Sequence, residues 1–252
     1  MVSVIILTKN AEHTLADCMS NVRDIADEIL VIDSGSSDRT VEIAKINNAR
    51  VIEHQMENFA DQRTMAISLA KGDWLLYVDA DEFATKRFCA EVKKVINTYD
   101  PESGIGGYFI RRKTYYLGKD WGFTDSVQRL FLKEKLLRWE GVVHETPKII
   151  GEFGYIESPV HHFTHQNLSQ MLHKTIEWSD YEAQLRFDAK HPFMTPLRFV
   201  RVMGTGFLDS YIKGKGYRNG TEGFIEGIYQ GYSMFITYAK LWEKQINKKK
   251  TV

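Results

Sequence analysis

Short apolar runs alternate with amphipathic segments along roughly the first 80 residues of the chain. Four runs are rich in β-branched residues, and their nearly continuous apolar character predicts strands buried on both faces of a sheet. These runs span residues 2–7, 28–32, 51–54 and 74–78. The segments between them carry apolar residues at helical spacing. The expected helices span residues 11–22, 41–46 (with Ser37 and Asp38 as caps) and 59–70 (ended by Gly72).

Strands and helices that alternate at this spacing predict an α/β fold with a Rossmann-like, mostly parallel sheet and flanking helices. Ligands of such sheets lie beyond the carboxyl ends of the strands. Thr8, Asp33 and Asp79 all fall at those ends. We therefore expect the functional site at this edge of the sheet.

The pattern changes after a predicted helix over residues 85–99. Two further strands are expected in a mixed or antiparallel region, and the chain then becomes mostly helical, with breaks at Pro192 and Pro196. The strands span residues 108–116 and 127–133, and the helices span 168–189, 197–212 and 223–246. We expect a domain over residues 1–165 that contains the functional site, and a helical C-terminal extension over residues 166–252.

Composition adds a charge asymmetry to this picture. The formal net charge is zero, but residues 166–252 hold 13 Lys and Arg against 8 Asp and Glu. A basic helical region beside an acidic catalytic region suggests an anionic partner for the helices, and ordinary surface variation is the alternative. No run reaches the roughly 18 apolar residues of a membrane-spanning helix, and the start of the chain does not resemble a signal peptide.

The two cysteines, Cys18 and Cys89, form no disulfide framework and no metal-binding spacing. Both fall in predicted helices and are expected to be small buried hydrophobic residues. Their number fits a reducing cytosol.

The segment from Val31 to Thr40 places Asp33 at a strand end. Its carboxylate can accept a hydrogen bond from a base N–H or a ribose hydroxyl, and Gly35 permits a tight turn close to a ligand. Thr8 and Asn10, at the end of the first strand, are candidates to contact the same base or ribose. A plain capping loop or a simple strand-to-helix turn is the alternative for each segment.

Asp79 and Asp81 form a D-x-D pair directly after the fourth strand. If the strand persists, both side chains lie on one side of it, and two carboxylates suit Mg²⁺ or Mn²⁺ carrying a diphosphate. Arg63 falls near the start of the third helix, where a cation could reach the diphosphate. A solvated surface arginine is the alternative for Arg63.

His144 and Glu145 follow a short apolar stretch. A glycosyl transfer that inverts configuration needs a base to deprotonate the acceptor hydroxyl, and Glu145 is the first candidate, with His144 second. His162 lies in a cluster of three histidines over residues 161–165. An imidazole there is a plausible further ligand for Mn²⁺, whereas helix-entry packing is the alternative.

Aromatic residues and Lys or Arg recur through the helical region. A stripe at helical spacing packs against a partner helix more often than it meets lipid, yet the basic excess favours an interfacial membrane helix. Both readings stay open, and so does assembly into a homo-oligomer.

Several of these motifs together resemble one family. They are the opening residues 4–10, the segment 26–40, residues 72–75 and 79–82, residues 141–145, His162 and the closing residues 235–242. In these motifs the chain is similar to family 2 glycosyltransferases of the GT-A fold. It more closely resembles the bacterial lipopolysaccharide core glycosyltransferases of the WaaE/KdtX type, which add glucose to inner-core heptose. The similarity covers nearly the whole chain.

The resemblance implies roles for individual residues. Thr8 and Asp33 would bind the nucleotide, Asp79 and Asp81 would form the D-x-D, and His162 would be the further metal ligand. Glu145 occupies the place where many members carry the aspartate of an E-D base motif. Arg63 and Thr64 stand where relatives often have Lys and Asn.

The resulting expectation is an inverting glycosyltransferase that depends on Mn²⁺ or Mg²⁺. Its donor would be a nucleotide sugar, UDP-glucose, and its acceptor a lipid-linked saccharide of the lipopolysaccharide inner core. We expect a cytoplasmic protein, peripheral on the inner face of the cytoplasmic membrane, with no nucleic-acid partner. The alternatives are the same chemistry on a capsule, glycoprotein or peptide acceptor, and a catalytically inactive GT-A binding module.

Overall fold

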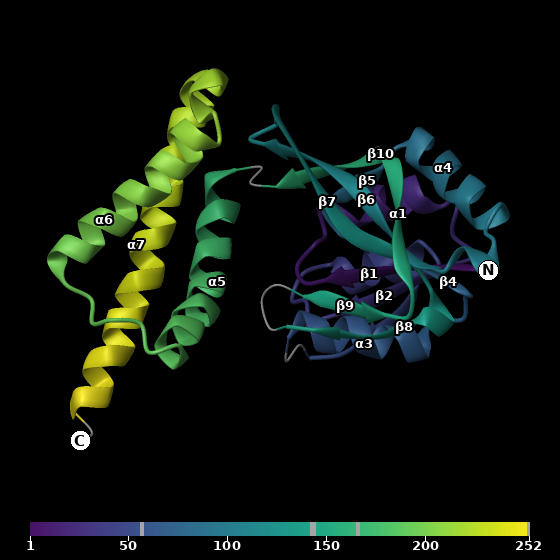
Figure 1. Ribbon diagram of the computed structural model, residues 1–252, viewed down its shortest axis with the longest axis horizontal. Helices are drawn as coiled ribbons and strands as arrows, with labels where there is room; N and C mark the ends of the chain where they lie inside the picture. Colours follow the sequence, from purple (N-terminus) through teal and green to yellow (C-terminus); the bar gives the residue numbers. More distant parts are fainter. Residues whose placement is uncertain (56–57, 142–144, 165–166, 251–252) are drawn as a thin grey trace. The chain divides into compact units, whose positions relative to one another are not determined.

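The computed structural model describes residues 1–55, 58–141, 145–164 and 167–250, and these fall into two compact units (Figure 1). The first unit is Met1–Tyr115 with Gly122–Thr164. The second is Tyr116–Trp121 with His165–Val252. The second unit therefore differs from the expected region 166–252 because it also includes residues 116–121 from the middle of the chain.

An eight-stranded sheet forms the centre of the first unit, in the order β3-β2-β1-β4-β7-β6-β10-β5. β1 pairs in parallel with β2 and β4, and β2 pairs in parallel with β3, whereas β7 is antiparallel to β4 and β5 is antiparallel to β10. The strands are β1 (Val2–Thr8), β2 (Glu28–Asp33), β3 (Arg50–Glu53), β4 (Trp74–Asp79), β5 (Glu82–Ala84), β6 (Ile105–Tyr116), β7 (Lys119–Leu132) and β10 (Glu152–Thr164). The expected parallel α/β sheet is confirmed.

Both faces of β1, β2 and β4 are buried, as their nearly continuous apolar sequences predict, whereas β3 at the sheet edge is only partly buried. Val4 and Ile6 of β1 belong to one core cluster, and Ile5 and Leu7 belong to another. Successive side chains of a strand point to opposite faces, so one strand serves two cores. The first core includes residues of α1 (Leu15–Val22), α2 (Thr40–Ile46) and α4 (Lys86–Asn97). The second includes residues of α3 (Phe59–Leu69) and β8 (Leu136–Glu140).

The start of α2 and the end of α3 differ from the expected positions. α2 begins at Thr40, and Asp38 accepts hydrogen bonds from the backbone of Thr40 and Glu12 rather than forming the expected cap. α3 ends at Leu69, so Gly72 does not end it. A Cβ at Gly72 would lie 2.6 Å from the backbone nitrogen of Ser3, so glycine is needed there for close approach to β1.

Four strands were not expected from the sequence. β5 has three residues, and β8 pairs with β9 (Thr146–Ile149) in a separate two-stranded sheet. β10 contains His161 and His162 of the histidine cluster, whereas His165 lies outside the described residues, and it also contains Gly154. A Cβ at Gly154 would lie 2.5 Å from the Tyr108 ring, which explains a glycine inside a strand.

The second unit is helical, and its three predicted helices are confirmed with small shifts in their bounds. They are α5 (Leu168–Asp188), α6 (Pro196–Leu208) and α7 (Gly220–Lys250). Gly206 of α6 and Gly227 and Gly231 of α7 allow close packing of these two helices. A Cβ at any of the three would lie within about 3.1 Å of an atom of the other helix or of the turn that follows α6. Among the described residues, no helix is long and apolar enough to cross a membrane.

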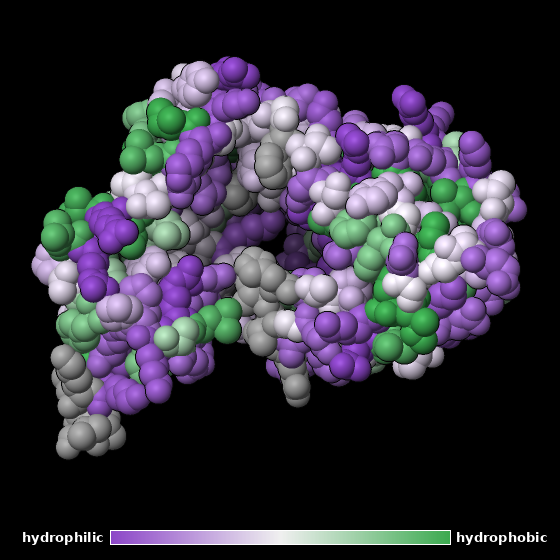
Figure 2. All heavy atoms as spheres, viewed as in Figure 1, coloured by the Kyte–Doolittle hydropathy of each residue, from purple (hydrophilic) through white to green (hydrophobic). Residues whose placement is uncertain are grey.

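Hydrophobic side chains lie at the surface of the helical unit, interspersed with hydrophilic ones (Figure 2). Exposed examples occur on all three helices, such as Leu172 of α5, Leu197 of α6 and Ile228 of α7. Phe224 and Trp242 of α7 are also exposed, so the aromatic residues of this region do not all pack inside it.

Candidate active site

The ends of β1 and β2 are joined through the carboxylate of Asp33, which is buried. Its Oδ1 accepts from the hydroxyls of Thr8 (3.1 Å) and Ser36 (2.5 Å), and its Oδ2 accepts from the backbone N–H groups of Gly35 (3.0 Å) and Ser36 (2.8 Å). A carboxylate has about four acceptor positions, so the loop itself occupies them. Asp33 here shapes the loop after β2.

Asn10 fixes the same loop from the end of β1. Its side-chain oxygen accepts from the backbone N–H (2.9 Å) and the hydroxyl (3.3 Å) of Ser37, while its own backbone N–H donates to the Ser36 hydroxyl (2.8 Å). Gly35 has a φ of 78°, a left-handed conformation that favours glycine. Three of the predicted nucleotide-binding residues, Thr8, Asn10 and Asp33, thus lie together in one hydrogen-bonded loop.

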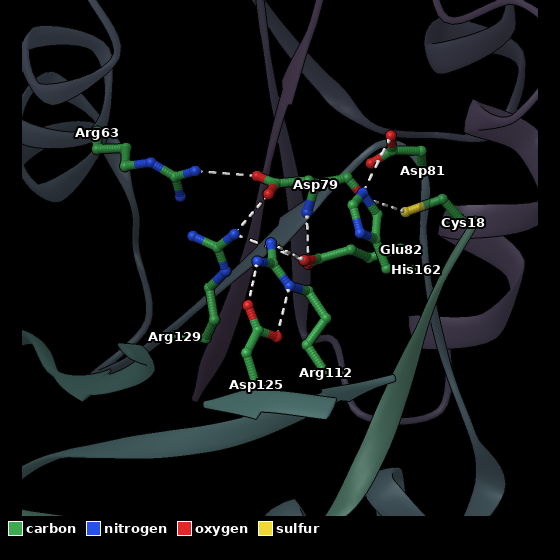
Figure 3. A network of polar contacts seen from close by, with 9 residues as sticks. All are labelled: Cys18, Arg63, Asp79, Asp81, Glu82, Arg112, Asp125, Arg129 and His162. Atoms are coloured by element: carbon green, nitrogen blue, oxygen red, sulfur yellow. Dashed lines mark hydrogen bonds and ion pairs between the residues drawn. The ribbon is translucent and has the colours of Figure 1, made fainter. Parts of the chain in front are cut away.

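Asp79, at the end of β4, is held by two arginines (Figure 3). Its Oδ1 accepts from Arg63 Nη2 at 2.9 Å, and its Oδ2 accepts from Arg129 Nη2 at 2.5 Å. Arg63 and Arg129 are buried, whereas 29% of the Asp79 side chain remains exposed. The carboxylate is therefore accessible from outside while its charge is matched from within.

Glu82 is fully buried beneath this cluster. Its Oε2 accepts from the backbone N–H of Asp79 (3.0 Å), and its Oε1 lies 3.5 Å from both Arg129 and Arg112. Arg112 also donates two hydrogen bonds to Asp125, at 3.1 and 2.6 Å. Three guanidinium groups and three carboxylates thus form one network (Figure 3).

Burial and neighbouring charges act in opposite directions on these groups. Burial would raise the pKa of Asp79, but Arg129 and Arg63 hold it well below its usual value. Burial, together with the charge of Asp79, raises the pKa of Glu82. Burial would lower the pKa of Arg129, yet Asp79 and Glu82 raise it. Asp79 therefore stays ionised. Glu82 is the carboxylate whose charged form is most destabilised by burial.

Strand alternation explains why Asp79 meets arginines. Asp79 is on the same face of β4 as Tyr77, whose side chain packs in the core beneath α3. The Tyr77 hydroxyl donates to the backbone carbonyl of Arg63 (2.7 Å), and the Arg63 guanidinium lies over the rings of Trp139 (5.1 Å) and Tyr77 (5.6 Å). The expectation that Arg63 belongs to the site therefore has a structural basis, and its solvent-exposed alternative is wrong.

Asp81 lies apart from this arrangement. β4 ends at Asp79 and a turn follows, so the condition for two carboxylates on one side of a continuing strand is not met. The Asp81 carboxylate lies 3.3 Å from Nε2 of His162, which the antiparallel pairing of β5 with β10 brings alongside. Among the residues that the structure describes, no three His, Cys, Asp or Glu side chains are arranged to hold a metal ion.

Asp81 and His162 nevertheless supply a donor set that fits a divalent cation. Within the described part of the chain, Nδ1 of His162 is buried without a hydrogen-bond partner. A carboxylate and an imidazole suit Mn²⁺, and Mg²⁺ commonly uses one or two carboxylates together with substrate phosphates and water. The two arginines occupy only two of the roughly four acceptor positions of the Asp79 carboxylate, which is partly exposed.

Glu145 lies close enough to Arg129 for its charge to contribute to the raised pKa of that arginine. The candidate base and the first aspartate of the D-x-D thus both act on the charge of one guanidinium. His144, the second candidate base, lies outside the described residues.

Arg129 is the residue of this site that the sequence reading missed, together with Glu82, Arg112 and Asp125. A signal for it exists in the sequence. Arg129 interrupts the apolar run of β7 two residues before the buried Phe131. A cation on the inward face of a strand needs a buried anion, and the D-x-D of the neighbouring β4 provides it.

Comparison with known proteins gives a consistent result. Residues 3–151 match the family model described as Glycosyl transferase family 2. An uncharacterized glycosyltransferase of Rickettsia typhi is 24% identical over 270 aligned positions, which cover 100% of this chain and 90% of the relative. The lipopolysaccharide core biosynthesis glycosyltransferase LpsC of Rhizobium meliloti is 25% identical over 268 positions, which cover 98% and 93% respectively.

Among solved structures, glucosyl-3-phosphoglycerate synthase of Mycobacterium tuberculosis, in complex with Mn²⁺, UDP and glucosyl-3-phosphoglycerate, has a TM-score of 0.37 and 22% identity. The match covers 46% of this chain and 44% of that chain. A similarity of this size does not bear on the ligands or the metal of the present site.

Proposed function

The chain belongs to glycosyl transferase family 2 and is a glycosyltransferase, and from this premise we propose that it transfers glucose from UDP-glucose to a sugar of the lipopolysaccharide inner core, with inversion at the transferred carbon. The observation that supports a nucleotide-sugar donor is the grouping of polar residues at the carboxyl ends of β1, β2 and β4. The similarity to LpsC along nearly the whole chain supports the acceptor class.

The arginines next to Asp79 are suited to a diphosphate. Nε and Nη1 of Arg63 and Nε of Arg129 are buried, and in the described part of the chain none of them has a hydrogen-bond partner. Unpaired buried donors cost free energy, and the oxygens of a diphosphate would satisfy them with charge-assisted hydrogen bonds. Arg63 would thus bind the donor, as expected from the sequence, and Arg129 would bind it as well.

Glu145 is the proposed base. It would take the proton of the acceptor hydroxyl as the oxygen attacks the sugar carbon, while the nucleoside diphosphate leaves from the opposite side. Arg129 would keep positive charge between this carboxylate and Asp79, so that the two anions can lie near one another. Thr8, Asn10 and Asp33 would hold the loop that receives the nucleoside.

A divalent cation, Mn²⁺ or Mg²⁺, would be held by Asp81 and His162, with Asp79 beside them. When bound, it would offset the charge that develops on the departing diphosphate.

The test is the turnover of a panel of nucleotide sugars by the purified protein, measured as release of the nucleoside diphosphate. We expect UDP-glucose to be preferred, EDTA to abolish turnover, and Asp81→Ala to abolish it as well. Transfer to an inner-core lipopolysaccharide acceptor, detected by mass spectrometry, tests the acceptor. Full activity in excess EDTA would reject the metal, and a lack of turnover with every nucleotide sugar would favour an inactive binding module.

The acceptor we propose is lipid-linked, and its place is the inner face of the cytoplasmic membrane. A capsule, glycoprotein or peptide acceptor is the competing assignment. Mass spectrometry of lipid-linked glycans from cells with and without the gene separates these alternatives.

A further inference from the structure

Helix α6 has one face inside the helical unit and one face open. The inner face packs on α7, where the rings of Phe199 and Phe235 lie 5.5 Å apart and Gly206 lies against the backbone of Gln230. The outer face carries Leu197 and Leu208, both exposed, at a spacing that repeats every three to four residues along the helix. The apolar residues on the open face are therefore not required by the packing on α7.

The exposed residues of this face are large and apolar. Leu197 is 79% exposed and Val200 is 69% exposed, and Leu208 and Ile212 continue the line into the following turn. Figure 2 shows hydrophobic and strongly hydrophilic side chains next to one another along this part of the surface. Apolar area of this kind, in a continuous stripe, marks an interaction surface.

The charges on this helix are all positive. Arg198 and Arg201 are exposed, and residues 196–208 include no acidic residue. The first acid after them, Asp209, is paired with Lys213 at 2.6 Å. An apolar stripe beside exposed arginines is the pattern of a helix that lies in the plane of a membrane interface.

These observations favour a lipid surface over a second copy of the same face. A symmetric dimer through α6 would bury Arg198 and Arg201 against the same face of the other copy, where residues 196–208 carry arginines and no acid. Because the helix supplies no acid to offset them, that contact would carry like-charge repulsion. Anionic lipid headgroups offset the same arginines, and the acyl region accepts Leu197 and Val200.

We propose that the outer face of α6 is a membrane-docking surface, which binds anionic lipid through Arg198 and Arg201 and inserts Leu197, Val200, Leu208 and Ile212 into the interface. This inference rests on the proposed function, because a lipid-linked acceptor gives the enzyme a reason to bind a membrane. The helix lies on the bilayer and does not cross it.

The test is flotation of the full-length protein with phosphatidylcholine vesicles and with vesicles that also contain phosphatidylglycerol. We expect binding to the anionic vesicles at low salt and its loss at high salt. Arg198→Glu with Arg201→Glu should weaken binding on the order of 30-fold or more, since each basic residue near an anionic surface contributes a factor of about five. Leu197→Ser with Val200→Ser should weaken it on the order of tenfold or more.

Matched controls come from the first unit. Lys93→Glu with Lys94→Glu reverses two exposed charges on α4, and Leu137→Ser with Ile150→Ser removes exposed apolar side chains. Neither pair should change flotation. UDP-glucose turnover without acceptor should be the same in all these variants, because none of them alters the site.

Two results would overturn the inference. One is a lack of flotation at low salt with donor turnover intact, which would leave the proposed function standing. The other is a stable dimer in solution that Leu197→Ser dissociates, which would make α6 an assembly surface. Flotation without turnover of any nucleotide sugar would instead count against the proposed function alone.

Discussion

Arg129 lies at the centre of the site, although the sequence did not predict it. It donates to Asp79, lies 3.5 Å from Glu82 and interacts electrostatically with Glu145. A buried guanidinium that pairs with Asp79 and Glu82 cannot be replaced by a neutral side chain without leaving buried charge uncompensated. The stability of the fold and the role proposed for Arg129 in donor binding therefore depend on the same guanidinium.

Replacing Arg129 by leucine tests the stability part. We expect the free energy of unfolding to fall by about 3–5 kcal/mol, because Asp79 and Glu82 would lose a buried partner. Urea denaturation followed by circular dichroism measures the change. Arg39→Leu is the control, since Arg39 pairs with Glu42 at the exposed surface, and it should leave stability nearly unchanged. Equal effects of the two substitutions would contradict the buried network.

Replacing Glu145 by glutamine tests the base. The amide keeps size and hydrogen bonding but cannot accept a proton, so we expect transfer to slow by roughly 10²-fold or more. Binding of UDP-glucose, measured by calorimetry, should stay close to that of the unaltered enzyme. If transfer is unchanged in this variant and is lost in His144→Ala, the role of base passes to His144.

At the scale of elements, sequence patterns predict those strands and helices that local sequence alone determines. β1 and β4 are nearly continuous apolar runs and were predicted within one or two residues. β5 and β10 were missed, because a three-residue strand and a strand that contains Gly154 and two histidines form only through pairing with distant partners. Propensity does not report such tertiary pairing.

The same limit explains what was and was not predicted of the site. Strand ends placed Thr8, Asp33 and Asp79 at one edge, since that follows from the parallel topology. The hydrogen-bond donors that surround Asp33 could not be predicted, because the path of the loop determines which groups reach its carboxylate. The partnership of Arg129 with Asp79 depends on β7 lying next to β4, a pairing between residues about 50 positions apart along the chain.

Close packing of the start of α7 on the short turn at Gly216–Asn219 leads to a prediction about glycines. A Cβ at Gly223 would lie 1.8 Å from the carbonyl oxygen of Gly216, so Gly223→Ala should destabilise the protein by about 1–3 kcal/mol. Gly204, within α6, has nothing within 4 Å of such a Cβ. Gly204→Ala should therefore stabilise by about 0.5–1 kcal/mol through helix propensity. Thermal unfolding compares the two, and the same sign for both would contradict the packing.

The attachment of α4 to β10 leads to a prediction about pH. Glu91 of α4 accepts from the backbone N–H groups of Glu157 and Ser158, both at 2.9 Å. Burial would raise the pKa of Glu91, but the hydrogen bonds from Ser158 and Glu157 hold it below the usual value. A pKa lowered by folding stabilises the protein above the unfolded value of about 4.3, and this stabilisation is lost as the pH falls through the folded value.

Glu91→Gln should therefore cost on the order of 1 kcal/mol at pH 7 and progressively less below about pH 4. Denaturant unfolding at several pH values measures the difference from the unaltered protein. Glu134→Gln, at an exposed position, is the matched control and should show no such trend. A cost for Glu91→Gln that grows on acidification would reverse the assignment.

At the scale of the whole molecule, the hydrophobic cores of the two units differ in extent. The sheet unit buries side chains on both faces, with every residue of β1 buried. The helical unit has a buried cluster around Ala183, Met194 and Leu241, and exposes apolar residues on each helix. Regions with fewer buried contacts open at lower free energy.

Hydrogen exchange should reflect this difference. We expect the amides of β1, β2 and β4 to exchange most slowly and those of α5, α6 and α7 to exchange faster, as read by mass spectrometry of proteolytic peptides. Uniform protection across both units would contradict the expectation. Exchange that is slowest in α6 would contradict it most directly.

The grouping of residues 116–121 with the helices has a consequence for how this protein can be recombined. The tip of the β6–β7 hairpin belongs to the helical unit, where Lys119 pairs with Glu222 at 2.8 Å. The unit is thus made from two separate pieces of sequence. A chimera that exchanges only the part after residue 165 with a relative would join a foreign α7 to the original hairpin tip. A functional transplant, in the laboratory or in the history of the family, has to carry both pieces together.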